Sequence, residues 1–167
     1  MPYVFSQYAD ASVFAVCLLA AAVVVFVFLG TRLALIDART HRLPNRLVGP
    51  WYLCAAPLLV GAALAAGEPG HVLRIVAGGA ILLAFYLLLH LIQPQGMGMG
   101  DVKLAGVLGM YLGAASWEHL LLGTLAAFLL GGAYAAALIL TRKASRKSMI
   151  PFGPFMLVGT AAALLVG

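Results

Sequence analysis

Two aspartates, Asp37 and Asp101, lie at the edges of strongly apolar segments of a chain that has only five acidic residues in 167. Asp37 follows the first long apolar run, and Asp101 precedes the fourth. An ionisable group at a membrane boundary is costly and is by default a candidate for a functional site. Two carboxyl groups at one depth would form an acid/base pair that hydrolyses a peptide bond, because one group takes a proton from water while the other protonates the carbonyl oxygen.

Two carboxyl groups held close together cannot both ionise easily, so the pair is expected to share one proton and to titrate as a unit. A helix dipole favours negative charge at the N-terminus and disfavours it at the C-terminus. Asp101 is expected to begin a helix, where it could be the N-cap, and Asp37 to end one. We therefore predict that Asp101 is the more readily ionised partner and that Asp37 more often holds the proton. Arg39 and Arg42 could reverse this assignment.

The composition is that of a membrane protein, with 64% hydrophobic and 9% charged residues and a mean hydropathy of +1.07. Soluble domains carry about 25% charged residues. The length suits a single domain, residues 1–167. The net charge of +5 would suggest nucleic-acid binding in a soluble protein, but here the basic residues cluster in short connections, so no nucleic-acid partner is expected. Cys17 and Cys54 lie inside apolar runs without a CxxC or Cys/His cluster, so neither a disulfide nor a metal or other cofactor is expected.

A helix needs about 20 apolar residues to span a bilayer. Six such runs lie near 12–36, 47–66, 72–92, 102–115, 119–140 and 150–166. The fourth is short, so it is expected to extend into its flanks or to lie where the fold is thin. Irregular backbone is not viable against lipid. The sequence therefore predicts an all-α membrane protein, a bundle of about six transmembrane helices with short loops.

The basic residues predict the orientation of this bundle. In a six-span arrangement, nine of the ten Lys and Arg residues fall on one side, and only Arg74 falls on the other. The positive-inside rule makes the basic side cytoplasmic and places both termini outside. The protein is thus expected to be a multi-pass protein of the cytoplasmic (inner) membrane. Asp37 and Asp101 fall on the cytoplasmic side, although neither was used to derive the topology.

A glycine-rich segment precedes Asp101, with glycines at 96, 98 and 100. Glycine lacks a Cβ atom, so the backbone at Gly98 and Gly100 can take φ > 0 and approach another chain closely. A substrate strand would then run beside this loop and present its scissile carbonyl to the two aspartates. The alternative is a flexible connector in which Asp101 is a simple helix cap.

Three short motifs resemble those of one known family. Gly-Met-Gly-Asp-Val-Lys-Leu at 98–104 resembles the GxGD-x-K-L motif of type IV prepilin peptidases, which are polytopic aspartic proteases. Asp37, followed by Leu-Pro-Asn at 43–45, resembles that family's first-aspartate motif, D-x5-[IL]-P-[ND]. Pro-Phe-Gly-Pro-Phe at 151–155 resembles the segment that opens the family's last helix. The resemblance covers most of the chain with the motifs in the right order.

The resemblance implies that Asp37 and Asp101 are the catalytic pair of an endopeptidase. It also implies a pilin-like precursor as substrate, cut at the cytoplasmic membrane face after a short basic leader, commonly after Gly. Larger bacterial members carry paired CxxC motifs in a cytoplasmic loop and N-methylate the new terminus. Here the connection at 37–47 is about ten residues long and has no Cys. N-methyltransferase activity is therefore expected to be absent or supplied elsewhere, as in the minimal members that serve tight-adherence or archaeal-type pilus systems.

The supporting residues have two interpretations each. Lys103 either holds a carboxylate or the leader, or anchors the helix by snorkelling. Pro44 and Asn45 are expected to form the turn into the second helix, with direct substrate contact the less favoured role.

Two other functions remain open. One is an intramembrane protease of the presenilin or signal-peptide-peptidase type, which shares GxGD, and the other is a non-enzymatic transporter or assembly subunit whose buried acids relay protons. The sequence does not indicate an oligomeric state.

Overall fold

The computed structural model describes residues 12–40, 43–94, 97–141 and 151–166. These parts of the chain form six helices and no strands. The helices are α2 (Val13–Thr40), α3 (Asn45–Ala65), α4 (Pro69–Ile92), α5 (Met99–Ala115), α6 (Trp117–Leu140) and α7 (Gly153–Leu165). The predicted all-α fold is confirmed.

Four of the helices, α2, α3, α4 and α6, are long and apolar enough to cross a membrane. Helix α5 has 17 residues and α7 has 13. Helix α2 continues to Thr40, beyond the expected end near residue 36. The residues after Asp37 contain no helix breaker, and the first proline is Pro44, which has extended backbone angles before α3. Asp37 therefore lies within α2 rather than after it.

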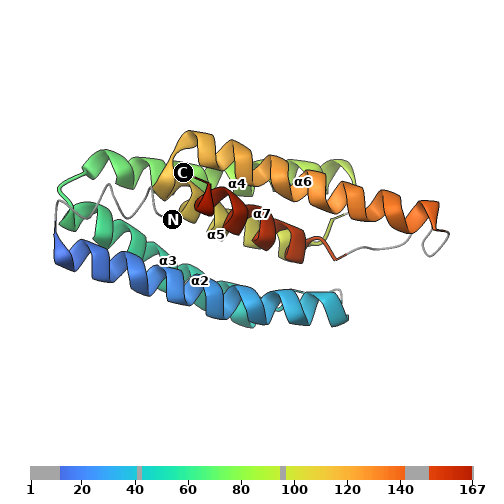
Figure 1. Ribbon diagram of the computed structural model, residues 1–167, viewed down its shortest axis with the longest axis horizontal. Coiled ribbons are helices and arrows are strands. Elements are labelled where there is room, and N and C mark those ends of the chain that lie inside the picture. Colours follow the sequence, from blue (N-terminus) through green and yellow to red (C-terminus); the bar gives the residue numbers. More distant parts are fainter. Residues whose placement is uncertain (1–11, 41–42, 95–96, 142–150, 167) are drawn as a thin grey trace.

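Helices α2 and α3 lie side by side along one side of the bundle, α4 and α6 lie on the opposite side, and α5 and α7 lie between them (Figure 1). Helix α5 is the most enclosed, with 14 of its 17 residues buried. A helix that is apolar on all its faces is stable only where it is surrounded by protein or lipid. The central position of α5 places Asp101, in its first turn, at the middle of one end of the bundle.

Small residues let α4 and α5 approach closely. A Cβ atom added at Gly78 would lie 2.6 Å from the carbonyl oxygen of Gly109. One added at Gly113 would lie 2.5 Å from the carbonyl oxygen of Arg74. No larger side chain fits at these positions without moving one helix backbone away from the other.

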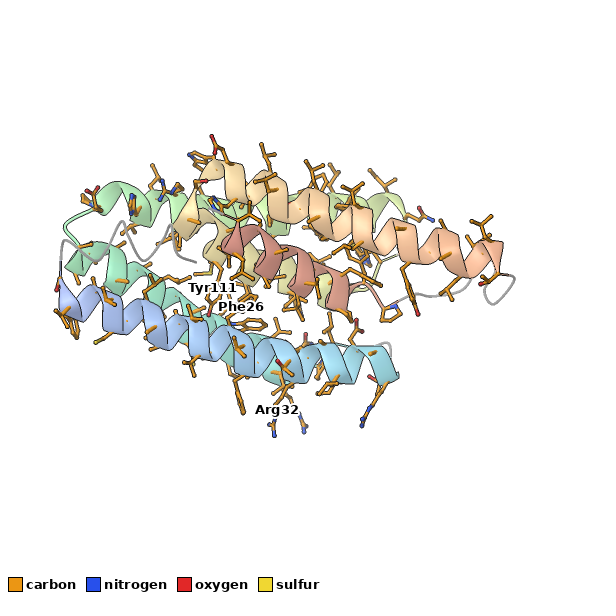
Figure 2. All side chains as sticks on the ribbon, in the orientation of Figure 1. Phe26, Arg32 and Tyr111 are labelled. Atoms are coloured by element: carbon orange, nitrogen blue, oxygen red, sulfur yellow. The ribbon has the colours of Figure 1, made fainter. Side chains whose placement is uncertain are left out.

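A buried aromatic cluster fixes the pair α2 and α3 against α5. Phe26 of α2 and Tyr111 of α5 point toward one another, with ring centroids 5.2 Å apart (Figure 2). The Tyr111 hydroxyl donates to the carbonyl oxygen of Ala22 at 2.9 Å and lies 3.2 Å from Nε1 of Trp51, which donates to it. Arg32 points away from the bundle, with its guanidinium 5.1 Å from the centroid of the Phe28 ring (Figure 2). The helix that carries Asp37 is thereby held in a defined register with the helix that carries Asp101.

Candidate active site

Asp37 and Asp101 line the same cleft, whose volume is about 450 Å³. Both side chains are buried, with 4% and 8% of their surface exposed. The cleft is lined further by Leu43, Pro44, Asn45, Gly98, Met99 and Gly100. The structure thus brings together six of the seven residues singled out from the sequence. They come from α2, α3 and α5 and from the segments before α3 and α5. Lys103 is the seventh and does not line the cleft.

Asp101 occupies the third position of α5, and its side chain accepts a hydrogen bond from the residue that precedes the helix. Gly98 is the N-cap residue, with extended backbone angles of φ −74° and ψ 148°. Oδ2 of Asp101 accepts a hydrogen bond from the Gly98 amide at 3.1 Å, which is the reach-back half of a capping box. The expectation that Asp101 could itself be the N-cap is wrong, because α5 begins earlier, at Met99. Oδ1 of Asp101 is buried and has no hydrogen-bond partner among the described residues.

Asp37 is held by a helix that lies far away in the sequence. Its Oδ2 accepts a buried hydrogen bond of 3.1 Å from the amide of Gly153, the first residue of α7. Asp37 therefore faces the positive end of α7, although it lies near the C-terminal end of its own helix. The prediction that Asp37 more often holds the shared proton took no account of the α7 dipole. The positive end of α7 offsets the negative end of α2 at Asp37, whereas Asp101 faces the positive end of α5 alone, so the dipoles favour ionised Asp101 by less than α2 by itself suggests, and the assignment stays a prediction.

Gly100 permits a close backbone approach, but neither Gly98 nor Gly100 takes the positive φ that the sequence suggested, and the substrate strand beside them stays a prediction. A Cβ atom at Gly100 would lie 2.6 Å from Cβ and 3.2 Å from the carbonyl oxygen of Leu43, so Gly100 does permit a close backbone approach. The approaching chain is the protein's own segment before α3. Among the described glycines only Gly67 has a positive φ, so Gly98 and Gly100 need no left-handed conformation. The third glycine, at position 96, lies outside the described residues.

Lys103 links α5 to α3 beside the cleft. Its Nζ donates to Oδ1 of Asn45 at 3.0 Å, and its carbonyl oxygen accepts from the Tyr52 hydroxyl at 2.8 Å. Asn45 is the first residue of α3, as expected for a turn into that helix. These contacts give Lys103 a partner that neither of its two sequence interpretations included, and they attach the start of α3 to the start of α5.

Three residues of this region were not singled out from the sequence: Leu43, Met99 and Gly153. All three stood within motifs, but a motif does not reveal which of its residues the fold brings to this region. In the described part of the chain, no group of three or more His, Cys, Asp or Glu residues is arranged to hold a metal ion.

Comparisons with known proteins agree with the motifs. A sequence model of the type IV leader peptidase family matches residues 23–136, which include both aspartates. The prepilin leader peptidase/N-methyltransferase of Aeromonas salmonicida is 34% identical over 138 residues, which are 81% of this chain and 45% of that protein. Its counterpart in Bacillus subtilis is 29% identical over 144 residues, which are 86% of this chain and 55% of that protein.

The leader peptidase HopD of Salmonella typhimurium is 34% identical over 128 residues, which are 75% of this chain and 80% of HopD. The chain thus spans about half the length of the Aeromonas and Bacillus relatives and most of the length of HopD. No solved structure matches the chain significantly. The family match extends over more than half of the sequence, and the chain belongs to the type IV leader peptidase family.

Proposed function

We propose that this protein is a membrane-embedded aspartic endopeptidase that removes the leader peptide of a type IV prepilin-like precursor. The observation that carries the proposal is the burial of Asp37 and Asp101 in a single cleft of a chain that belongs to a leader peptidase family. The names of its relatives, prepilin leader peptidase and leader peptidase, support the same reaction.

The two carboxyl groups would divide the work of peptide hydrolysis. One, ionised, takes a proton from a water molecule, whose oxygen attacks the scissile carbonyl carbon. The other, protonated, gives its proton to the carbonyl oxygen, which yields a tetrahedral diol. The first group then gives its proton to the amide nitrogen while the second takes a proton from a hydroxyl of the diol, so that the C–N bond breaks, a carboxylic acid and an amine are released, and the pair again shares one proton. The anchoring of each Oδ2 by a glycine amide supports this scheme, because it restricts how each carboxyl group can turn.

The buried Oδ1 of Asp101 supports the same role. This oxygen has no hydrogen-bond partner among the described residues, so no protein group occupies its lone pairs. In the proposed reaction it exchanges a proton with substrate or water in the cleft.

The proposed location of the reaction is the cytoplasmic face of the inner membrane. Arg39 lies in the last turn of α2, two residues after Asp37, and Lys103 lies two residues after Asp101. An excess of Lys and Arg is typical of cytoplasmic loops. The four apolar helices support a bilayer as the surroundings of the bundle. Arg42 and the basic residues at 142–147 lie outside the described residues, and only their positions in the sequence support this location.

Co-expression with a candidate prepilin tests the proposal. The wild-type protein is expected to shorten the precursor by its leader, whereas Asp37→Asn and Asp101→Asn each lower the cleavage rate by about 10²- to 10⁴-fold, since each removes one acid/base group. Gly132→Ala is a matched control, because nothing lies within 4 Å of the added Cβ atom. Cleavage that persists in either Asn variant would contradict the pair assignment. A wild-type protein that conducts protons and cuts no precursor would favour the transporter alternative.

A further inference from the structure

Gly153 lies at the point where the last helix meets Asp37. It is the first residue of α7, it is buried, and its amide donates to Oδ2 of Asp37 across 116 positions of sequence. A Cβ atom added at Gly153 would lie 2.8 Å from Oδ2 and 3.4 Å from Cγ of Asp37. It would also lie 3.4 Å from Cδ1 of Leu43, which is an ordinary contact distance. The carboxyl group therefore occupies the space that any larger residue at position 153 would need.

The local backbone does not call for glycine at this position. Among the described residues the only positive-φ glycine is Gly67, so Gly153 has a conformation that any residue adopts. In a helix interior, alanine is more favourable than glycine by about 1 kcal/mol. Position 153 is the first of its helix, where this preference does not apply in full, but the backbone there does not require glycine, whereas the contact with Asp37 leaves no room for a side chain.

The backbone at Gly153 cannot easily retreat from Asp37, because the preceding residue is wedged against α6. A Cβ atom at Gly131 of α6 would lie 2.7 Å from Cε2 of Phe152. The Phe152 ring also packs on Phe128, with centroids 5.3 Å apart. An added methyl group at 153 must therefore displace the carboxyl group of Asp37 rather than the start of α7.

We infer that Gly153 is a positioning residue for Asp37, whose missing side chain lets the α7 amide hold the carboxyl group in its reactive orientation. The inference rests on the proposed function, since it assigns a role within that reaction. Gly153 acts through Asp37 and need not touch the substrate. A misplacement of a reacting group by up to 1 Å costs as much as about 100-fold in rate. A methyl group at 153 is thus expected to lower kcat and to leave KM nearly unchanged.

Three alanine variants of the purified full-length protein test the inference, with kcat and KM for precursor cleavage and the thermal unfolding temperature measured for each. Gly153→Ala is expected to lower kcat by about 10- to 100-fold, with KM within about threefold and the unfolding temperature unchanged. Gly159→Ala lies on the same helix, where its Cβ atom would lie 2.6 Å from the Ala127 nitrogen, and is expected to lower the unfolding temperature with kcat unchanged. Gly132→Ala is expected to change neither quantity.

Several results would overturn the inference. They are a wild-type kcat for Gly153→Ala, a loss confined to KM, and a loss of kcat that accompanies an unfolding temperature as low as that of Gly159→Ala. Asp37→Asn in the same assay separates this failure from failure of the proposed function. If Asp37→Asn is inactive and Gly153→Ala is normal, only the positioning role is wrong. If the wild-type protein leaves the precursor intact, or Asp37→Asn still cleaves it, the proposed function and the inference fall together.

Discussion

The two ends of α5 differ in how their polar groups are paired: those at the C-terminal end have hydrogen-bond partners, and one at the N-terminal end has none among the described residues. At the C-terminal end, the Arg74 guanidinium of α4 donates to the carbonyl oxygens of Gly113 and Ala114 at 2.8 and 3.1 Å. These are among the carbonyls that a helix end leaves without intrahelical partners. At the N-terminal end, Asp101 faces an open cleft, and its Oδ1 is buried without a hydrogen-bond partner among the described residues.

One end of the helix is therefore stabilised by its contacts, and the other end carries a residue of the proposed reaction. The C-terminal end holds a charge-assisted cap, which contributes to stability. The N-terminal end carries a buried acid beside the cleft, an arrangement that is common at reactive sites. Arg74 was the one basic residue on the non-cytoplasmic side of the predicted topology. Its contacts with α5 give it a structural role that is independent of orientation.

Of changes at the two ends of α5, those at the N-terminal end are expected to affect cleavage most. Gly100→Ala would place a Cβ atom 2.6 Å from Cβ of Leu43 and should push the segment before α3 out of the cleft. We expect the cleavage rate to fall by about 10- to 100-fold, because substrate and aspartates would no longer align. Gly49→Ala in α3 is the control, since nothing lies within 4 Å of its added Cβ atom. Equal rates for the two variants would show that the close approach at Gly100 is dispensable.

Changes at the C-terminal end should affect stability and spare cleavage. Arg74→Met keeps an apolar stem but leaves the Gly113 and Ala114 carbonyls without their donor, so we expect a loss of about 1–3 kcal/mol in the free energy of unfolding. Thermal unfolding in detergent measures it. Arg32→Met removes an outward-pointing guanidinium above Phe28 and should cost about 0.5–1 kcal/mol at most. An Arg74→Met protein that unfolds normally and fails to cleave would reverse the assignment of the two ends.

The smallest effect is expected at Lys103, which lies near the functional end and outside the cleft. Lys103→Met removes an exposed hydrogen bond to Asn45, whose net contribution is about 0.5–1 kcal/mol, so the cleavage rate should fall by about two- to fivefold. Asn45→Ala should reproduce that loss, and the double variant should add little, since both changes break one interaction. A far larger loss for Lys103→Met than for Asn45→Ala would mean that Lys103 also contacts the substrate.

Much of the fold follows from the sequence, because length and apolarity decide where a membrane helix can form. The observed helices begin and end within four residues of the predicted runs. The largest difference is at the end of α2. The fall in hydropathy at Asp37 suggested that the helix ends near residue 36, but no residue there breaks the helix, and it continues to Thr40. The two aspartates could be selected as well, because charge is rare in these segments and each stands in a recognisable motif.

The sequence by itself determined the helices, the two acids and the end of the bundle at which both lie. Only the tertiary structure decided which groups hold those acids. Gly153 reaches Asp37 because α7 packs against α2, and Lys103 reaches Asn45 because α5 lies beside α3. Hydropathy and local propensity describe each helix alone, whereas a hydrogen bond between residues 116 positions apart depends on how the helices pack against each other.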